Sequence, residues 1–176
     1  ATPGIWTVYV YGDIILDGTV DAYLPLSSIG YPNINFIQPD PNFTITVPGT
    51  SSSVITVGAY NHIDNSLFIN SSWGPTRFPA NSPDFVAPGV RVTGIYPTGK
   101  GVMSGTSVAT AITTGACALM LQWGIVEGNM STFDTFQIRG YLIRGCERDS
   151  NLTYPNYQWG YGKLDLYNSL NLIREL

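Results

Sequence analysis

The sequence has few charged side chains and only one imidazole. Of its 176 residues, 11% are charged, with 8 Lys and Arg against 12 Asp and Glu, and no basic run occurs. Proteins that bind nucleic acid or anionic membranes usually carry a basic patch, so we expect neither partner. The single histidine, His62, matters because many catalytic sites depend on a well-placed imidazole.

Cysteine is also scarce, and the positions of the two cysteines give no support to a structural metal site. Cys117 and Cys146 lie far apart in the sequence, without a CxxC motif or a neighbouring histidine. Two free buried thiols are the expectation, and one disulfide stays open as an alternative. Because 44% of the residues are apolar, the chain can bury a sizeable core, which excludes disorder.

One long stretch, between Lys100 and Glu127, contains no charged residue. Residues 108–126 nearly reach the length of a bilayer-spanning helix. They include three threonines and a glutamine and lack basic flanks, so we interpret them as a buried central helix. No signal-peptide pattern opens the chain at ATPGIW, and we expect a processed or truncated start.

The first part of the chain has the composition of β-strands. Residues 5–11 and 14–26 are rich in β-branched and aromatic side chains, and Asp17-Gly18 provides a hairpin turn between apolar residues. Residues 27–42 are rich in Pro, Asn, Gly and Ser and predict a loop with one short strand at 34–37. We expect a domain boundary after residue 43.

The second part alternates strand and helix patterns. Val54 to Ala59 is a short apolar run typical of a strand buried in a parallel sheet. Such alternation predicts an α/β fold. The further expected elements are a strand at 90–95, a glycine-rich turn at 99–107, a helix from Val108, a helix from a cap at Ser131 or Thr132 to Arg144, and a helix from Asp165 to Leu172.

Ser107 stands where a glycine-rich turn enters the long uncharged helix. A helix N-terminus leaves backbone N–H groups unpaired and partly positive, and these groups can hold an oxyanion beside a serine nucleophile. Serine is also a common helix cap. From this turn alone, both interpretations of Ser107 stay open.

An ordered set of five blocks, one of which contains Ser107, favours the interpretation of Ser107 as a nucleophile. VITVGAYN, NSSWGP, DFVAPG, GTSVATAITTGACALML and WGYGKLDL occur in this order, and the set resembles the C-terminal half of subtilisin-like serine peptidases, the subtilases. The resemblance covers about residues 46–172. It implies a parallel sheet flanked by helices, with the central helix starting at the nucleophile.

A narrower resemblance is to the clostridial subtilases related to spore-germination proteases. It rests on PGIWTVYVYG, Gln38-Pro39-Asp40-Pro41, LQWGIVEGN, YLIRG and YPNYQWGYG. It implies that residues 1–43 are the last strands of an inserted β-sandwich and that residues 44–176 are the C-terminal portion of the catalytic domain. It also implies a secreted or spore-associated setting.

The subtilase resemblance assigns roles to individual residues. Ser107 matches the nucleophile, and Thr106 matches a residue whose hydroxyl helps to stabilise the oxyanion. Ser104 and Gly105 border the substrate cleft, and Gly49 lies at the edge of the pocket for the side chain before the scissile bond. The chain departs from the family at Ala111-Ile112, where Pro and His are usual.

The motifs for the family's catalytic Asp and His and its oxyanion Asn do not occur in this sequence. His62 is followed by Ile, not by Gly-Thr, so we interpret it as a loop histidine. Gly49, Ser51 and Val54 align with carbonyls that bind a weak cation in some relatives, but no carboxylate completes a calcium site. We therefore expect no metal and no cofactor.

The resulting expectation is a serine endopeptidase acting on polypeptides, in which this chain supplies Ser107. An N-terminal portion of the same protease would be its partner, and the chain alone would be inactive. One alternative is a pseudoprotease or regulatory scaffold with the same fold. Another is a binding module whose N-terminal strands leave open edges through which it would form homo-oligomers.

Overall fold

The computed structural model describes residues 3–24, 34–77 and 83–174 of the chain. Contacts divide the chain into two units, Ala1–Pro39 and Asp40–Leu176. The sequence placed this boundary after residue 43. The origin of the first unit as the end of an inserted β-sandwich stays a prediction.

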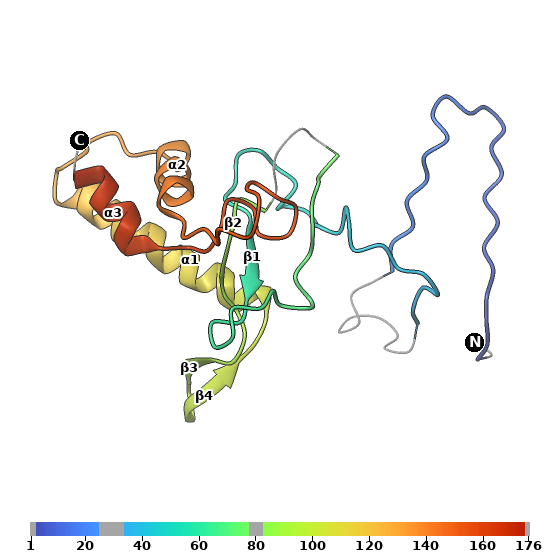
Figure 1. The fold of residues 1–176 in the computed structure, drawn as a ribbon, viewed down its shortest axis with the longest axis horizontal. Helices are drawn as coiled ribbons and strands as arrows, with labels where there is room; N and C mark the ends of the chain where they lie inside the picture. The colour runs from blue at the N-terminus through green and yellow to red at the C-terminus, as the bar shows by residue number, and fades with distance from the viewer. Residues whose placement is uncertain (1–2, 25–33, 78–82, 175–176) are drawn as a thin grey trace. The chain divides into compact units, whose positions relative to one another are not determined.

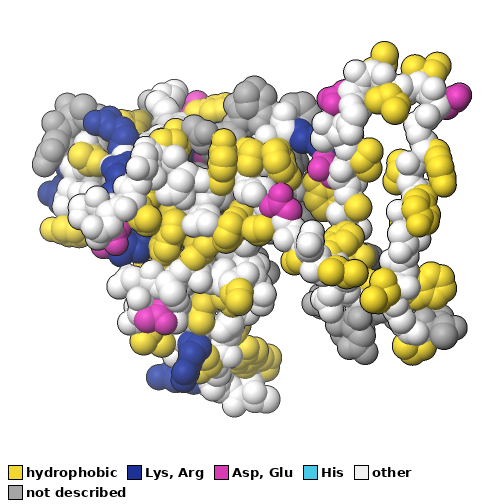
Figure 2. All heavy atoms as spheres, turned by 45° about the vertical axis from the view of Figure 1, so that its right-hand side comes forward, with side chains coloured by type: hydrophobic (Ala, Val, Ile, Leu, Met, Phe, Trp, Pro, Cys, Tyr) yellow, Lys and Arg dark blue, Asp and Glu magenta, His cyan; other side chains and the backbone are white. Residues whose placement is uncertain are grey.

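The first unit differs from the expectation of β-strands. Its described residues, 3–24 and 34–39, form neither strand nor helix. Most of their large apolar side chains are well exposed, as with Val8 at 85% and Leu16 at 97% exposure (Figure 2). At the expected hairpin turn, Asp17 accepts hydrogen bonds from the backbone and hydroxyl of Thr19. A strand forms only when a neighbour satisfies its backbone groups, and the described residues supply no such pairing here. Residues 25–33 lie outside the described part.

The second unit contains a parallel pair of strands, of which only the first was predicted from the sequence. β1 (Val57–Tyr60) pairs in parallel with β2 (Phe85–Pro88), with Ala59 opposite Ala87. The other edge of β2 is bonded to residues 162–164, because Val86 N donates to the Gly162 carbonyl and Leu164 N donates to the Val86 carbonyl. The WGYGKLDL motif, residues 159–166, therefore covers the edge of β2 that faces away from β1.

The long uncharged segment is the central helix of this unit. α1 (Thr106–Leu121) contacts both β1 and β2 and continues as η1 (Gln122–Val126), a π-helical turn (Figure 1). Ala59, Ala87 and Ala109 are fully buried together, so small side chains let the helix approach the sheet closely. By length and composition the helix could also cross a membrane, a test that the central helix of an α/β protein passes as well.

Two further helices close the core at the far end of α1. α2 (Thr135–Gly145) and α3 (Leu166–Arg174) pack against each other. α2 begins with a capping box in which Asp134 and Gln137 exchange side-chain and backbone hydrogen bonds. The prediction of Ser131 or Thr132 as the cap was therefore wrong. The buried core residues here are Phe85, Met120, Phe133, Ile138, Leu142, Cys146 and Ile173.

The glycine-rich segment before α1 is a strand, whereas the sequence indicated a turn. β3 (Val92–Tyr96) and β4 (Gly99–Met103) form an antiparallel hairpin that projects from the second unit (Figure 1). Gly94 lies opposite Gly101, and side chains of the neighbouring strand occupy the space where their Cβ atoms would stand. The glycines thus make room for cross-strand packing.

Both cysteines are free thiols. Cys146 is buried at 4% exposure, whereas Cys117 on α1 is only partly buried. The expectation of two free thiols is confirmed, and full burial holds for Cys146 alone.

Candidate active site

The start of α1 is held at the carboxyl ends of the two parallel strands. Gly105, the residue before the helix, donates its N–H to the Gly89 carbonyl at 2.7 Å, and Gly89 donates to the carbonyl of Tyr60 at the end of β1. Gly105 has a φ of 153°, which side-chain-bearing residues rarely adopt. A Cβ on Gly89 would lie 2.6 Å from the Ala59 Cβ and 2.9 Å from the Gly105 carbonyl oxygen. These glycines fix where the helix begins.

Ser107 is the second residue of α1, and it is not the helix cap. The capping position belongs to Gly105, and no side chain caps this helix. Ser107 is exposed, and no hydrogen bond of its hydroxyl to another described residue occurs. The capping interpretation of Ser107 is therefore excluded, and Ser107 is an exposed residue of a helix whose other face is buried.

The first turn of α1 presents backbone donors. Val108 and Ala109 both donate to the Gly105 carbonyl, at 3.1 and 3.4 Å. Among the described residues, the N–H groups of Thr106 and Ser107 have no acceptor. Donors of this kind at a helix N-terminus attract negative charge, so the turn can stabilise an oxyanion formed on a carbonyl that Ser107 attacks.

The other residues assigned from the sequence surround this helix start in different ways. Ser104 is tied to the base of the hairpin, because its hydroxyl accepts a hydrogen bond from the Arg91 N–H at 2.9 Å. Thr106 and Gly49 line one cavity of about 310 Å³, although they are far apart in the sequence. The structure thus brings Gly49 close to the start of α1, the helix that carries Ser107.

The lining of this cavity is uncharged. Its walls come from the segment before β1, from β1 itself, from the loop at Ser71 and from the start of α1, and the lining residues are Ile45, Thr46, Val47, Pro48, Gly49, Val54, Ile55, Thr56, Val57, Gly58, Ser71, Ser72, Pro83, Thr106 and Thr110. Apolar walls with a few hydroxyl groups are typical of pockets for apolar or small polar groups.

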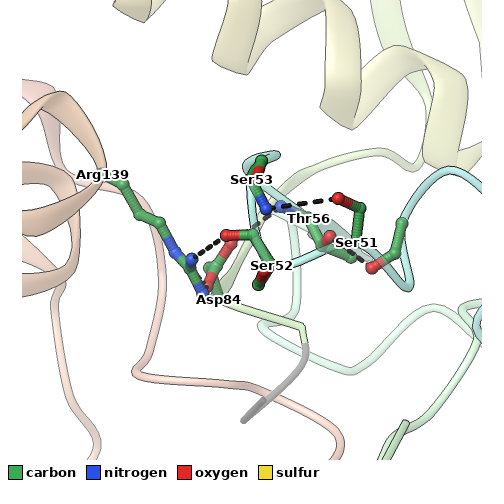
Figure 3. A network of polar contacts seen from close by, with 7 residues as sticks. Ser51, Ser52, Ser53, Thr56, Asp84 and Arg139 are labelled. Atoms are coloured by element: carbon green, nitrogen blue, oxygen red, sulfur yellow. Dashed lines mark hydrogen bonds and ion pairs between the residues drawn. The ribbon is translucent and has the colours of Figure 1, made fainter. Parts of the chain in front are cut away.

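The sequence did not identify the ion pair that lies behind this wall. Asp84 is fully buried immediately before β2, and its carboxylate pairs with Arg139 of α2 (Figure 3). Burial raises the pKa of the Asp84 carboxyl above its usual value of 3.8, while the Thr56 N–H and the Arg139 guanidinium act to lower it. A lone acidic residue before an apolar strand was the only signal in the sequence.

The described residues offer Ser107 no general base. His62 is exposed in the turn after β1 and makes no hydrogen bond to Ser107, in agreement with its interpretation as a loop histidine. No group of three or more His, Cys, Asp or Glu residues gathers within the described ranges.

Comparison with known proteins identifies the family. Residues 33–162 match the subtilase family of peptidases. The chain belongs to the subtilase family. Its α/β fold, with a parallel sheet and a central helix that begins at Thr106, one residue before Ser107, is the subtilisin-like fold that the sequence predicted.

Among individual relatives of this subtilase, serine protease AprX of Bacillus subtilis is 36% identical over 100 residues, which cover 45% of this chain and 23% of AprX. An uncharacterized protein of Aquifex aeolicus, aq_aa18, is 33% identical over 140 residues, covering 65% of this chain and 59% of aq_aa18. The chain thus spans less than two thirds of the length of either relative.

Solved structures give the same family. The CspB protease of Clostridium perfringens superposes with a TM-score of 0.75 at 35% identity, over 80% of this chain and 31% of that chain. The self-cleaved protease domain of PatA superposes with a TM-score of 0.61 at 26% identity, over 77% of this chain and 47% of that chain.

Proposed function

We propose that this subtilase is a serine endopeptidase in which Ser107 is the nucleophile. The observation that carries the proposal is the exposed, unbonded Ser107 at the start of a central helix. Its hydroxyl would attack the scissile carbonyl, and the oxyanion would receive the Ser107 N–H and the Thr106 hydroxyl. Ser104 and Gly105 would border the bound peptide.

The nucleophile needs a base that the described residues do not provide. A serine hydroxyl is a weak nucleophile near neutral pH unless a histidine takes its proton, and an aspartate must orient that histidine. We therefore assign the catalytic Asp and His and the oxyanion Asn to an N-terminal portion of the same protease. This portion would be the partner of residues 40–176.

The exposed face of α1 and η1 and the small size of the parallel sheet support such a partner. α1 and η1 carry apolar side chains at the surface, including Leu119 at 53% and Val126 at 78% exposure. Within the described residues, β1 and β2 form a two-stranded sheet, whereas parallel sheets in α/β proteins are usually larger and covered on both faces. A chain segment over α1 would bury its apolar face, and further strands from the partner would extend the sheet.

The cavity at Gly49 and Thr106 would accept the substrate side chain that precedes the scissile bond. Because the lining contains no charged residue, burying a charged side chain there would leave it without an ion-pair partner. We expect cleavage after uncharged residues in preference to Lys, Arg, Asp or Glu.

The likeness to the CspB protease also supports a kinship with clostridial spore-germination subtilases. On this basis we propose a secreted or spore-associated location. Immunodetection of the protein in spore and culture-supernatant fractions tests the location, and signal confined to the cytoplasm of vegetative cells would contradict it.

Turnover by the complete protease tests the function. The enzyme would be assayed on peptides with different uncharged residues at the cleavage position, alongside Ser107→Ala and the matched control Ser150→Ala, which makes the same change at an exposed serine. We expect Ser107→Ala to abolish turnover and Ser150→Ala to retain it. An inactive wild-type enzyme would instead favour a pseudoprotease scaffold.

A further inference from the structure

Arg139 lies on α2, outside the cavity lining, yet its side chain is bonded toward the cavity wall. Its Nε donates to Asp84 Oδ1 at 2.7 Å, and its Nη1 donates to the Ser52 carbonyl at 3.0 Å (Figure 3). The Arg139 side chain is 21% exposed and that of Asp84 is 1% exposed. The guanidinium thus joins α2 to the start of β2 and to the turn before β1.

Asp84 holds Thr56, the residue before β1, through two hydrogen bonds of opposite direction. The Thr56 N–H donates to Asp84 Oδ2 at 2.8 Å, and the Asp84 N–H donates to the Thr56 carbonyl at 2.7 Å. Charge-assisted bonds to a buried carboxylate are stronger and shorter than neutral ones. The backbone of Thr56 therefore has little freedom to move away from Asp84.

Thr56 in turn holds Gly49, which lies in the cavity wall. The Thr56 hydroxyl donates to the Gly49 carbonyl at 2.8 Å. A Cβ on Gly49 would lie 3.1 Å from the Thr46 carbonyl oxygen and 3.3 Å from Thr56 Cγ2, so the segment is closely packed as well. Both Gly49 and Thr56 line the cavity, whereas Arg139, Asp84 and Ser52 do not.

We propose that Arg139 is a positioning residue for substrate selectivity, acting through Asp84 and Thr56 to fix the Gly49 carbonyl and the 45–49 wall. The inference rests on the proposed function, in which this cavity receives the side chain before the scissile bond. A pocket distinguishes side chains that differ by a methylene only where its walls keep their geometry. Arg139 and Asp84 supply that rigidity from outside the cavity, without contact with the substrate, whereas Thr56 also forms part of the lining.

The same contacts could stabilise the fold without positioning the cavity wall. Measuring substrate selectivity distinguishes these two roles. If the relay only stabilises the fold, its loss lowers turnover equally for all peptides. If it positions the wall, its loss changes the ratio of kcat/KM between peptides that differ at the cleavage position, mainly through KM. Labelling of Ser107 by a small fluorophosphonate that leaves the cavity empty should then change little.

The experiment uses the complete protease with Arg139→Gln, Arg139→Lys, Thr56→Val and Thr56→Ser. Thr56→Val keeps the shape of the side chain and deletes the bond to Gly49, whereas Thr56→Ser retains a hydroxyl. Arg144→Gln, at an exposed arginine of the same helix, is the matched control. The readouts are kcat and KM on peptides with Ala, Leu or Phe before the scissile bond, and the fluorophosphonate labelling rate.

We expect Arg139→Gln and Thr56→Val to reduce the discrimination between these peptides by about tenfold, the scale of one methylene in a well-formed pocket. The labelling rate should stay within about twofold of wild type, because the helix start is not part of the relay. Thr56→Ser should retain selectivity, and Arg139→Lys, which keeps the charge without the planar fork, should be intermediate.

The possible results separate this inference from the proposed function. Unchanged selectivity in Thr56→Val and Arg139→Gln, with wild-type Ser107 labelled, would overturn the inference alone. An equal loss for all peptides and for labelling would also overturn it in favour of a purely structural role. A wild-type protease that is neither labelled nor active would overturn the proposed function and this inference with it.

Discussion

Replacing Arg139 with Met removes the cation of the buried pair while keeping most of the side chain's length. Asp84 is fully buried, and its Oδ1 accepts the Arg139 Nε–H at 2.7 Å. In Arg139→Met, the carboxylate keeps the Thr56 N–H as a donor but loses its counter-charge. We would study the complete protease in a Ser107→Ala background, so that self-digestion does not obscure unfolding.

The expected loss follows from the burial of Asp84. Deleting one partner of a buried ion pair costs about 3–5 kcal/mol. Because the Arg139 side chain is 21% exposed and water can partly replace it, we expect the lower end, about 3 kcal/mol at pH 7. The control Arg144→Met, at an exposed position in the last turn of α2, should cost about 0.5 kcal/mol through its interaction with the helix dipole.

The loss should depend on pH in a defined direction. Burial raises the pKa of Asp84 above 3.8, and Arg139 counteracts this, so the pKa rises further in Arg139→Met. Between the unfolded and folded pKa values, the folded state binds the proton more tightly. The free energy of unfolding therefore falls as pH rises through this window. The variant should recover part of its lost stability on acidification, when Asp84 becomes neutral.

Urea unfolding at pH 4.5 and pH 8 measures this dependence. The difference between wild type and Arg139→Met should be smaller at pH 4.5, and adding Asp84→Asn should restore stability at pH 8 by removing the buried charge. An equal difference at both pH values would refute the electrostatic reasoning and assign the effect to packing of the arginine stem.

Three further predictions concern other parts of the second unit. Gly89→Ala should slow fluorophosphonate labelling of Ser107 by tenfold or more in the complete protease, because the new Cβ would lie 2.9 Å from the Gly105 carbonyl oxygen and displacements near 1 Å cost up to about 100-fold; an unchanged rate would contradict it. Leu142→Ala, at a fully buried site, should cost about 2–5 kcal/mol in urea unfolding, against a small loss for the exposed Leu152→Ala. Burial raises the pKa of Cys146 to about 12, so iodoacetamide should alkylate it only under unfolding conditions, and rapid native alkylation would argue against its burial.

In the second unit, the sequence predicted those strands and helices whose pattern is contained in one continuous segment. The run ending at Ala59 predicted a buried strand, and the uncharged stretch predicted the central helix that α1 forms. The segment Gly99–Met103 was misassigned because glycine usually weakens strands, whereas here Gly101 makes room for the ring of Tyr96 across the hairpin. Residues 5–11 have strand composition, but pairing depends on a neighbour that composition does not specify.

In the candidate site, too, local motifs could be predicted from the sequence and contacts between distant residues could not. Ser107 could be predicted as the candidate nucleophile because a turn, a helix start and an ordered set of motifs lie together in the sequence. Arg139 was missed because its partners, Asp84 and the Ser52 carbonyl, are 55 and 87 positions away, and a single arginine in a helix gives no sign of such contacts. Likewise, only the folded chain shows that Gly49 and Thr106 line one cavity.

The most direct test of the central claim is fluorophosphonate labelling of Ser107, read by peptide mass spectrometry. The complete protease and the chain of residues 1–176 would be treated side by side, with Ser107→Ala as the control. We expect an adduct on Ser107 in the complete protease and none in the chain alone, because the described residues give the hydroxyl no base. Labelling of the isolated chain, or an adduct on a different residue of the complete protease, would contradict it.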